Sequence, residues 1–128
     1  MAENLLEDIA LHLEFEGFGQ LPDIDQDGDI YYGKLPDKPD AAIGVLSRDA
    51  GYSGSSQGAR IQLIVRGNST DESFEKAVKI TETLHDFIGF LAGDRASVNI
   101  VVENGPAGIG ADIKNREMYS INLRVYYC

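Results

Sequence analysis

Hydrophobic residues recur at helical spacing in two parts of the chain, residues 4–16 and residues 70–91. In the first part, one face is formed by Leu6, Ile9, Ala10 and Leu13. In the second part, the expected apolar positions are Phe74, Ala77, Val78, Thr81, Leu84, Phe87, Ile88 and Leu91. The pattern predicts an N-terminal amphipathic helix and one long helix.

Polar residues mark the predicted ends of both helices. Asn4 and Glu7 stand at capping-box spacing, and Gly17 follows the expected end of the first helix. Ser69 and Glu72 form a second capping box ahead of the longer helix.

Alternating apolar and polar residues predict strands in the rest of the chain. In residues 60–66, Ile61, Leu63 and Val65 share one face, and residues 97–103 and 114–127 are also typical of strands. Residues 30–35 and 41–47 are expected to pair as a hairpin with a wide turn. Glycine-rich residues 48–58 and 104–112 are expected to be flexible loops.

This order of elements predicts an α+β fold, with the long helix and the N-terminal helix packed on a mainly antiparallel sheet. At 128 residues the chain fits a single domain, residues 1–128. Cys128 is the only cysteine, so no intramolecular disulfide is possible. No apolar run reaches membrane-spanning length, and the acidic N-terminal segment does not resemble a signal peptide. We expect a soluble protein without a membrane partner.

The negative charge is concentrated in the first part of the chain. The net charge is −10, and residues 1–40 hold eleven acidic residues against Lys34 and Lys38, which gives −9. Neither part has the basic stripe that binds phosphates, which disfavours sequence-specific recognition of nucleic acid. The acids either keep the surface solvated or form an acidic face that meets a basic partner or repels polyanions.

The acidic segment DIDQDGDIYYGK, residues 23–34, partly matches a calcium-binding loop. The weak candidate ligands are Asp23, Asp25, Asp27 and Asp29. The twelfth position, which should supply a bidentate carboxylate, is Lys34, and a strand is expected after the loop instead of a helix. A solvated Asp/Gly turn is therefore the favoured interpretation, and no metal or other cofactor is expected.

Catalytic patterns fail in their context. Ser56 lies in a G-x-S-x-G sequence, but a strand is expected after it where the nucleophile elbow needs a helix. His12 and His85 have no second histidine or cysteine at metal-ligand spacing. His85 and Asp86, as neighbours on a helix, would point about 100° apart and would not pair directly. A structural or binding protein, not an enzyme, is the expectation.

Arginines near strands and turns are the remaining candidates for function. This set contains Arg60, Arg66, Arg95, Arg116 and Arg124. They are suited either to ion pairs across a subunit contact or to solvated surface.

The order of elements and the final strand EMYSINLRVYY, residues 117–127, resemble the tail-terminator proteins of long-tailed bacteriophages. The resemblance is strongest to the group called minor capsid proteins in phages of Gram-positive bacteria, and it spans nearly the whole chain. It implies a hexameric ring that caps the tail tube and joins the tail to the head connector. The protein would then be part of the virion and would occupy the host cytoplasm during assembly.

In such a ring, the partners are other copies of the chain, the tail-tube protein and the head–tail connector protein. Residues expected at these contacts are Arg48, Tyr52, Arg60, Arg66, Arg116, Arg124 and Tyr126. Two alternatives stay open: a calcium-responsive binding module that uses residues 23–29, and a small hydrolase that uses Ser56.

Overall fold

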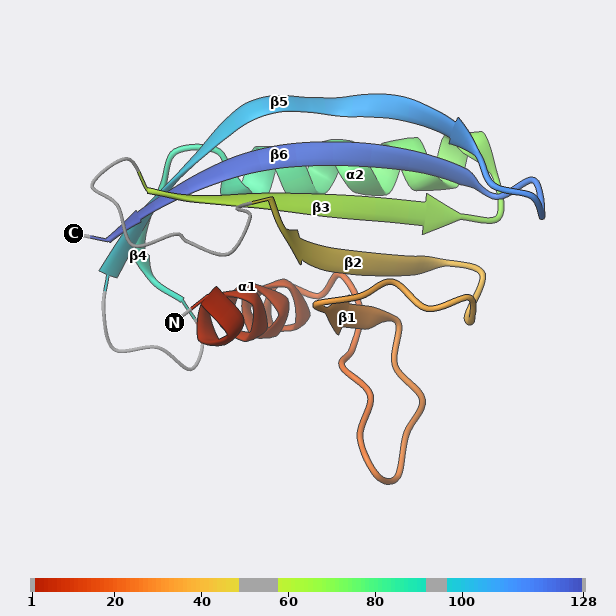
Figure 1. The fold of residues 1–128 in the computed structure, drawn as a ribbon, viewed down its shortest axis with the longest axis horizontal. Coiled ribbons are helices and arrows are strands. Elements are labelled where there is room, and N and C mark those ends of the chain that lie inside the picture. The colour runs from red at the N-terminus through yellow and green to blue at the C-terminus, as the bar shows by residue number, and fades with distance from the viewer. Residues whose placement is uncertain (1, 49–57, 92–96, 128) are drawn as a thin grey trace.

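A six-stranded sheet forms the centre of the molecule in the computed structural model, which describes residues 2–48, 58–91 and 97–127 (Figure 1). The elements in chain order are α1 (Ala2–Phe15), β1 (Ile30–Tyr32), β2 (Ala42–Ser47), β3 (Ala59–Gly67), α2 (Thr70–Leu84), β4 (Phe87–Phe90), β5 (Ser97–Ala111) and β6 (Glu117–Tyr127). The strands lie in the order β1-β2-β3-β6-β5-β4, and every pair except β1–β2 is antiparallel. The predicted α+β fold is confirmed.

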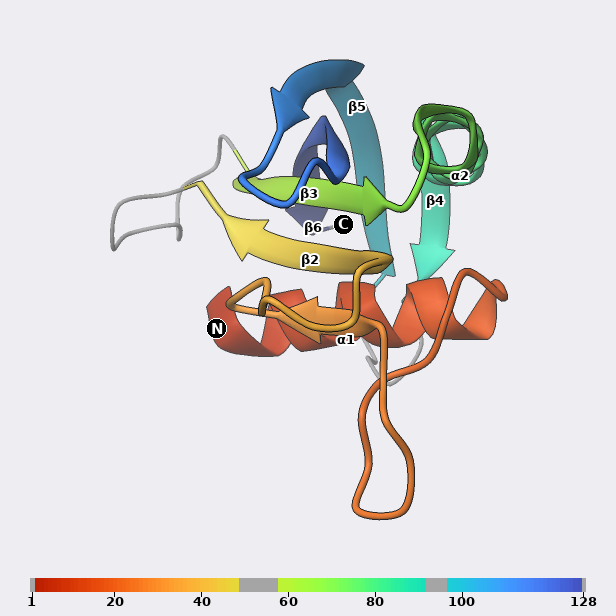
Figure 2. The ribbon, with the colours of Figure 1, turned by 90° about the vertical axis from the view of Figure 1, so that its right-hand side faces the viewer.

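The sheet is curled, and both helices pack on its concave side (Figure 2). The predicted alternation of β3 is confirmed, because Ile61, Leu63 and Val65 are buried in one core with the apolar face of α1. The buried face of α2 is rotated from the predicted one: Ile80 is buried, whereas Phe74 is 45% exposed. No helix in the described residues is long and apolar enough to span a membrane.

The predicted caps are partly correct. The Ser69 hydroxyl accepts a hydrogen bond from the backbone N–H of Glu72 at 3.2 Å, as the capping box predicts. Gly17 follows α1 with a φ of +91°. The cap predicted at Asn4 is wrong, because α1 already begins at Ala2.

The hairpin predicted between residues 30–35 and 41–47 is wrong, because β1 and β2 run parallel. Their register pairs Ile30 with Ile43. Gly33 has a φ of +80°, and its N–H donates to the carbonyl oxygen of Val45 at 2.8 Å. The chain leaves β1 at this point, and residues 33–41 return it so that β2 starts beside the beginning of β1.

The long helix predicted over residues 70–91 is also wrong in its last part. It ends at Leu84, and Asp86 adopts a φ of +60° before β4 begins. The spacing of Leu84, Phe87, Ile88 and Leu91 fits a helix, but the bulky residues of β4 equally suit a strand.

The loop predicted at residues 104–112 is wrong, because β5 continues to Ala111. The last strand, predicted from residue 114, begins slightly later, at Glu117. The β5–β6 register shifts three times in this glycine-rich part of β5, as at β-bulges. Gly105 has a φ of +114°, and a Cβ atom there would lie 2.5 Å from the carbonyl oxygen of Ser120. Its lack of a side chain therefore permits a close approach of two strands.

Candidate functional site

Three arginines form a row across neighbouring strands on the convex side of the sheet. Arg60 of β3 is paired in register with Arg124 of β6, and the N–H of Arg48 donates to the carbonyl oxygen of Arg60 at 2.9 Å. Their neighbours Ile61 and Leu123 point into the core, so the arginines lie on the opposite face. Arg48 and Arg60 are exposed.

The row continues into aromatic and aliphatic residues toward the β4 edge. Tyr126 is paired with Asn99 of β5, which is paired with Ile88 of β4, so these side chains share the convex face. Ile88 is 72% exposed and Phe90, on the same face, is 64% exposed. The sequence does not indicate either as a surface residue, because the apolar spacing of residues 70–91 predicts a helix there.

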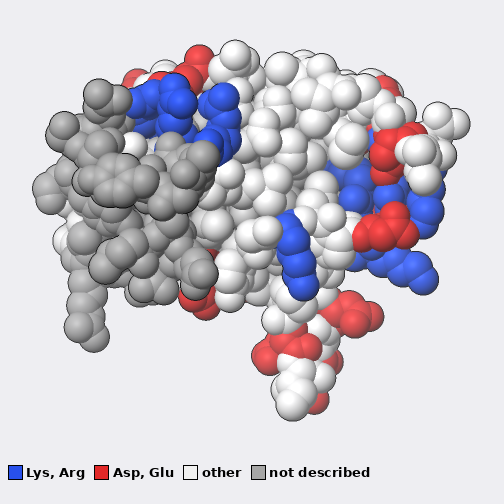
Figure 3. All heavy atoms as spheres, viewed as in Figure 1, with Lys and Arg blue, Asp and Glu red and all other residues white. Residues whose placement is uncertain are grey.

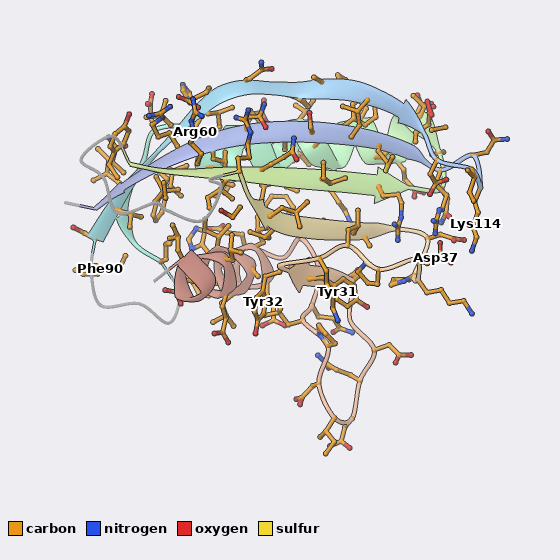
Figure 4. The ribbon with its side chains drawn as sticks, in the orientation of Figure 1. Tyr31, Tyr32, Asp37, Arg60, Phe90 and Lys114 are labelled. Carbon is orange, nitrogen blue, oxygen red and sulfur yellow. The ribbon has the colours of Figure 1, made fainter. Side chains whose placement is uncertain are left out.

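We call the whole surface the convex band, which consists of Arg48, Arg60, Arg124, Tyr126, Ile88 and Phe90. The basic group lies at the upper left of Figure 3, and Arg60 and Phe90 are labelled at the same end of the molecule in Figure 4. The Nε atom of Arg124 donates to Glu103 at 2.8 Å, which fixes its guanidinium. Arginine and aromatic side chains are enriched in protein interfaces, so the composition is that of a docking surface.

Arg66, predicted at a contact, is only 5% exposed. Its guanidinium donates to the carbonyl oxygens of Pro36 at 2.7 Å, Pro39 at 2.7 Å and Asp40 at 2.9 Å. These bonds hold the β1–β2 connection against β3. Burial lowers the pKa of Arg66, although a guanidinium keeps its charge at neutral pH.

Arg116, also predicted at a contact, is 6% exposed and binds three carboxylates. It donates to Asp112 at 2.8 Å, Asp37 at 2.9 Å and Asp40 at 3.2 Å. Lys114 also pairs with Asp37, and Figure 4 shows both at one end of the molecule. Hydrogen bonds from Arg116 lower the pKa of Asp112 to about 2, and hydrogen bonds from Lys114 and Arg116 lower the pKa of Asp37.

These ion pairs fasten the β1–β2 connection to the turn before β6. Arg66 and Arg116 therefore act within the subunit, on the side chains and carbonyls around them. Whether they also reach a neighbouring copy stays a prediction.

The acidic segment is an ordered hairpin, residues 19–29, which we call the prong. At its tip the backbones of Asp23 and Gln26 exchange hydrogen bonds of 3.0 and 3.2 Å around a two-residue turn. At its base the carbonyl oxygen of Gln20 accepts from Asp29 at 2.8 Å. Ile24 at the tip is 93% exposed, and the prong projects from the body with acidic side chains along it (Figure 3).

The four candidate calcium ligands take part in the hairpin. Asp23 accepts from the N–H of Ile24 at 2.6 Å, and Asp29 accepts from the N–H of Gln20 at 2.7 Å. Among the residues that the structure describes, no three histidine, cysteine or carboxylate side chains, including Asp25 and Asp27, converge as a metal-ligand set. The geometry of residues 23–29 is that of an ordered acidic turn.

His12 lies in an aromatic cluster, only 4% exposed, with its ring centre 4.8 Å from that of Phe87 and 6.3 Å from that of Phe15. Neither ring nitrogen has a hydrogen-bond partner in the described part of the chain, although Glu16 lies 3.4 Å from Nε2. Burial lowers the pKa of His12, and the nearby Glu16 offsets this only in part.

His85 and Asp86 do pair, contrary to prediction, with 3.6 Å between Nε2 and the carboxylate. The prediction failed because α2 ends before them and Asp86 has a positive φ. The Nδ1 atom of His85 accepts a hydrogen bond from the N–H of Val102 at 3.1 Å, which ties the end of α2 to β5.

Four predicted positions, Tyr52, Ser56, Arg95 and Cys128, lie outside the described residues, as does most of the predicted loop at residues 48–58.

Comparison with known proteins identifies a family for this chain. A family model described as bacteriophage tail terminator protein matches residues 12–127, which is most of the chain. Neither a curated protein nor a solved structure gives a significant match. The matched region contains the prong, the convex band and every strand of the sheet. The chain therefore belongs to the bacteriophage tail terminator proteins, a non-enzymatic family of structural components of the phage tail.

Proposed function

We propose that six copies of this chain form a ring that caps the finished tail tube and joins the tail to the head connector. Family membership carries this proposal, because it implies a role at the end of the tail tube and a place in the virion. The six-fold ring and the connector contact are proposed from the resemblance. Assembly would take place in the host cytoplasm.

The structure supports a ring because it offers distinct surfaces on different sides of one subunit. A ring needs heterologous contacts, in which one surface of each copy meets a different surface of the next copy. The convex band lies on the outer face of the sheet, and the prong projects away from the body beside β1 (Figure 1). Two different surfaces of this kind suit the head-to-tail contacts of a ring, whereas a closed dimer uses one self-complementary patch.

The residues predicted at contacts have separate roles in this proposal. Arg48, Arg60, Arg124 and Tyr126 belong to the convex band and would meet another copy directly. Tyr52 is proposed at a contact from sequence alone. Arg66 and Arg116 would act from within, because they hold the β1–β2 connection in place.

The proposal is tested in a phage that lacks this protein. Since a terminator stops tube growth and provides the head-binding end, we expect tails of variable, excessive length and few tails joined to heads. Supplying the protein from a plasmid should restore uniform length and joining. Tails of normal length attached to heads without the protein would overturn the proposal, and normal tails without heads would restrict it to joining.

A further inference from the structure

We propose that the prong of one copy seats on the convex band of the next copy. This inference rests on the proposed ring and names the contact that builds it. The occupant of the convex band is thus a second copy of the same chain.

Charge is the first argument for this pairing. The prong carries Asp23, Asp25, Asp27 and Asp29 and has no lysine or arginine within residues 19–29. In the described residues, none of these four carboxylates takes part in an ion pair with a lysine or arginine. The convex band has three arginines in a row, of which Arg124 pairs with Glu103 at 2.8 Å, so the exposed Arg48 and Arg60 are the cations that the prong would meet. Guanidinium groups bind carboxylates in a fork geometry, so the two surfaces are complementary in charge and in chemistry.

Apolar surface is the second argument. Ile24 is 93% exposed at the tip of the prong, and Ile88 and Phe90 are 72% and 64% exposed on the convex band. Ile88 and Phe90 lie on one face of β4, and a contiguous exposed apolar patch rimmed by polar residues marks an interaction surface. Seating the prong tip against the β4 end of the convex band would bury all three, while the aspartates reach the arginines.

Geometry is the third argument. The prong extends away from the sheet in both ribbon views, and Arg60 lies on the other side of the molecule (Figures 1, 2 and 4). A prong therefore meets the convex band of another copy, not its own, which is the head-to-tail contact of a ring.

The prong is also ordered before it binds. Gln20 donates from its amide to the carbonyl oxygen of Asp27 at 3.1 Å, and Gln26 donates to Leu21 at 2.9 Å. A Cβ atom on Gly28 would lie 2.2 Å from the nitrogen of Pro22, so the two arms are in close contact. A preformed element loses little conformational entropy on docking, which favours its use as a contact.

Charge reversal tests the pairing. One variant reverses the prong, Asp25→Arg with Asp27→Arg, and a second reverses the convex band, Arg48→Glu with Arg60→Glu. Each variant alone should form rings on tail tubes at least about tenfold less often than wild type, because like charges then face each other. A mixture of the two variants should recover assembly, since each prong then meets an oppositely charged band in an alternating ring.

Matched controls place the same charges elsewhere. Glu75→Arg with Glu82→Arg, and Lys76→Glu with Lys79→Glu, change the charge of α2 by equal amounts and should assemble as wild type. Melting temperatures check that every variant folds. Recovery by mixing cannot come from a folding defect, because two misfolded chains would not restore each other.

The outcomes separate this inference from the proposed function. If wild type caps tubes and either reversal also caps them normally, or if the mixture stays defective, the prong–band pairing is overturned while the capping role stands. If the control variants fail as badly as the reversals, the effect is not specific and the pairing is also overturned. If wild type itself never caps tubes, the proposed function fails.

Discussion

Replacing Arg66 with Met would remove the guanidinium that fixes the β1–β2 connection while keeping an unbranched apolar stem in the same site. Three hydrogen bonds would be lost, to the carbonyl oxygens of Pro36, Pro39 and Asp40. The segment 33–41 would then lack its main anchor to β3, and the parallel pairing of β1 with β2 would weaken first.

The magnitude follows from these bonds. A hydrogen bond to a charged group contributes about 1.5–3 kcal/mol, so three set an upper limit of roughly 4.5–9 kcal/mol. The true loss is smaller, because the freed carbonyls lie in a partly exposed segment and regain water, and because Met avoids the cost of burying a charge. We expect a decrease of about 3 kcal/mol in the free energy of unfolding, or roughly 10 °C in melting temperature.

Urea unfolding and thermal melting measure this loss, and Arg60→Met is the matched control on the same strand. Arg60 is exposed, so its replacement should change stability by less than about 1 kcal/mol. Hydrogen exchange should also show faster exchange at Gly33 and Ile43, whose N–H groups bond across this region. Equal stability of Arg66→Met and wild type, or equal losses in both variants, would refute the reasoning.

Three further variants test other parts of the structure. Burial lowers the pKa of His12, so below pH 6.5 the unfolded chain binds a proton that the folded chain does not. The free energy of unfolding is therefore highest above pH 6.5 and decreases as the pH falls below that value. His12→Phe should remove this decrease in melting temperature; an unchanged pH profile would contradict it. Hydrogen bonds from Arg116 lower the pKa of Asp112 to about 2, so its stabilisation is full above 3.8 and is lost as the pH approaches about 2. Asp112→Asn should flatten the melting temperature in that range, and a profile as steep as that of wild type would count against this role. Gly28→Ala places a Cβ atom 2.2 Å from the nitrogen of Pro22 and should open the prong, seen as faster proteolysis within residues 19–29 with the sheet still protected. Unaltered cleavage would show that the prong tolerates the side chain.

Sequence periodicity predicted the elements whose faces are buried on one side. The alternation of Ile61, Leu63 and Val65 and the spacing of Ile9 and Leu13 both identified core positions, because a single buried face imposes a single period. The N-cap at Ser69 was also predictable, since the capping box is a local interaction.

Contacts between distant residues decided what the sequence could not predict. Arg66 binds carbonyls 26 to 30 residues earlier in the chain, and these bonds hold the connection between the parallel strands β1 and β2, where the sequence predicts a hairpin. The glycines after residue 103 predict flexibility, but Gly105 is needed for the close approach of β6. Phe87 and Ile88 fit a helix or a strand equally well, and pairing with β5 selects the strand.

The candidate site was predictable only as separate parts. Single arginines and an acidic turn were visible in the sequence, but the convex band depends on the register of four strands and on where α2 ends. The sequence does not distinguish Arg66 and Arg116 from Arg48 and Arg60. In the structure the first two are buried against the β1–β2 connection, and the other two are exposed.

The most direct test of the central claim is electron microscopy of purified tail tubes mixed with this protein. We expect a ring of six copies at one end of each tube, and tubes that no longer elongate when more tube protein is added. Tubes whose ends carry no added density, and which continue to grow in the presence of the protein, would contradict it.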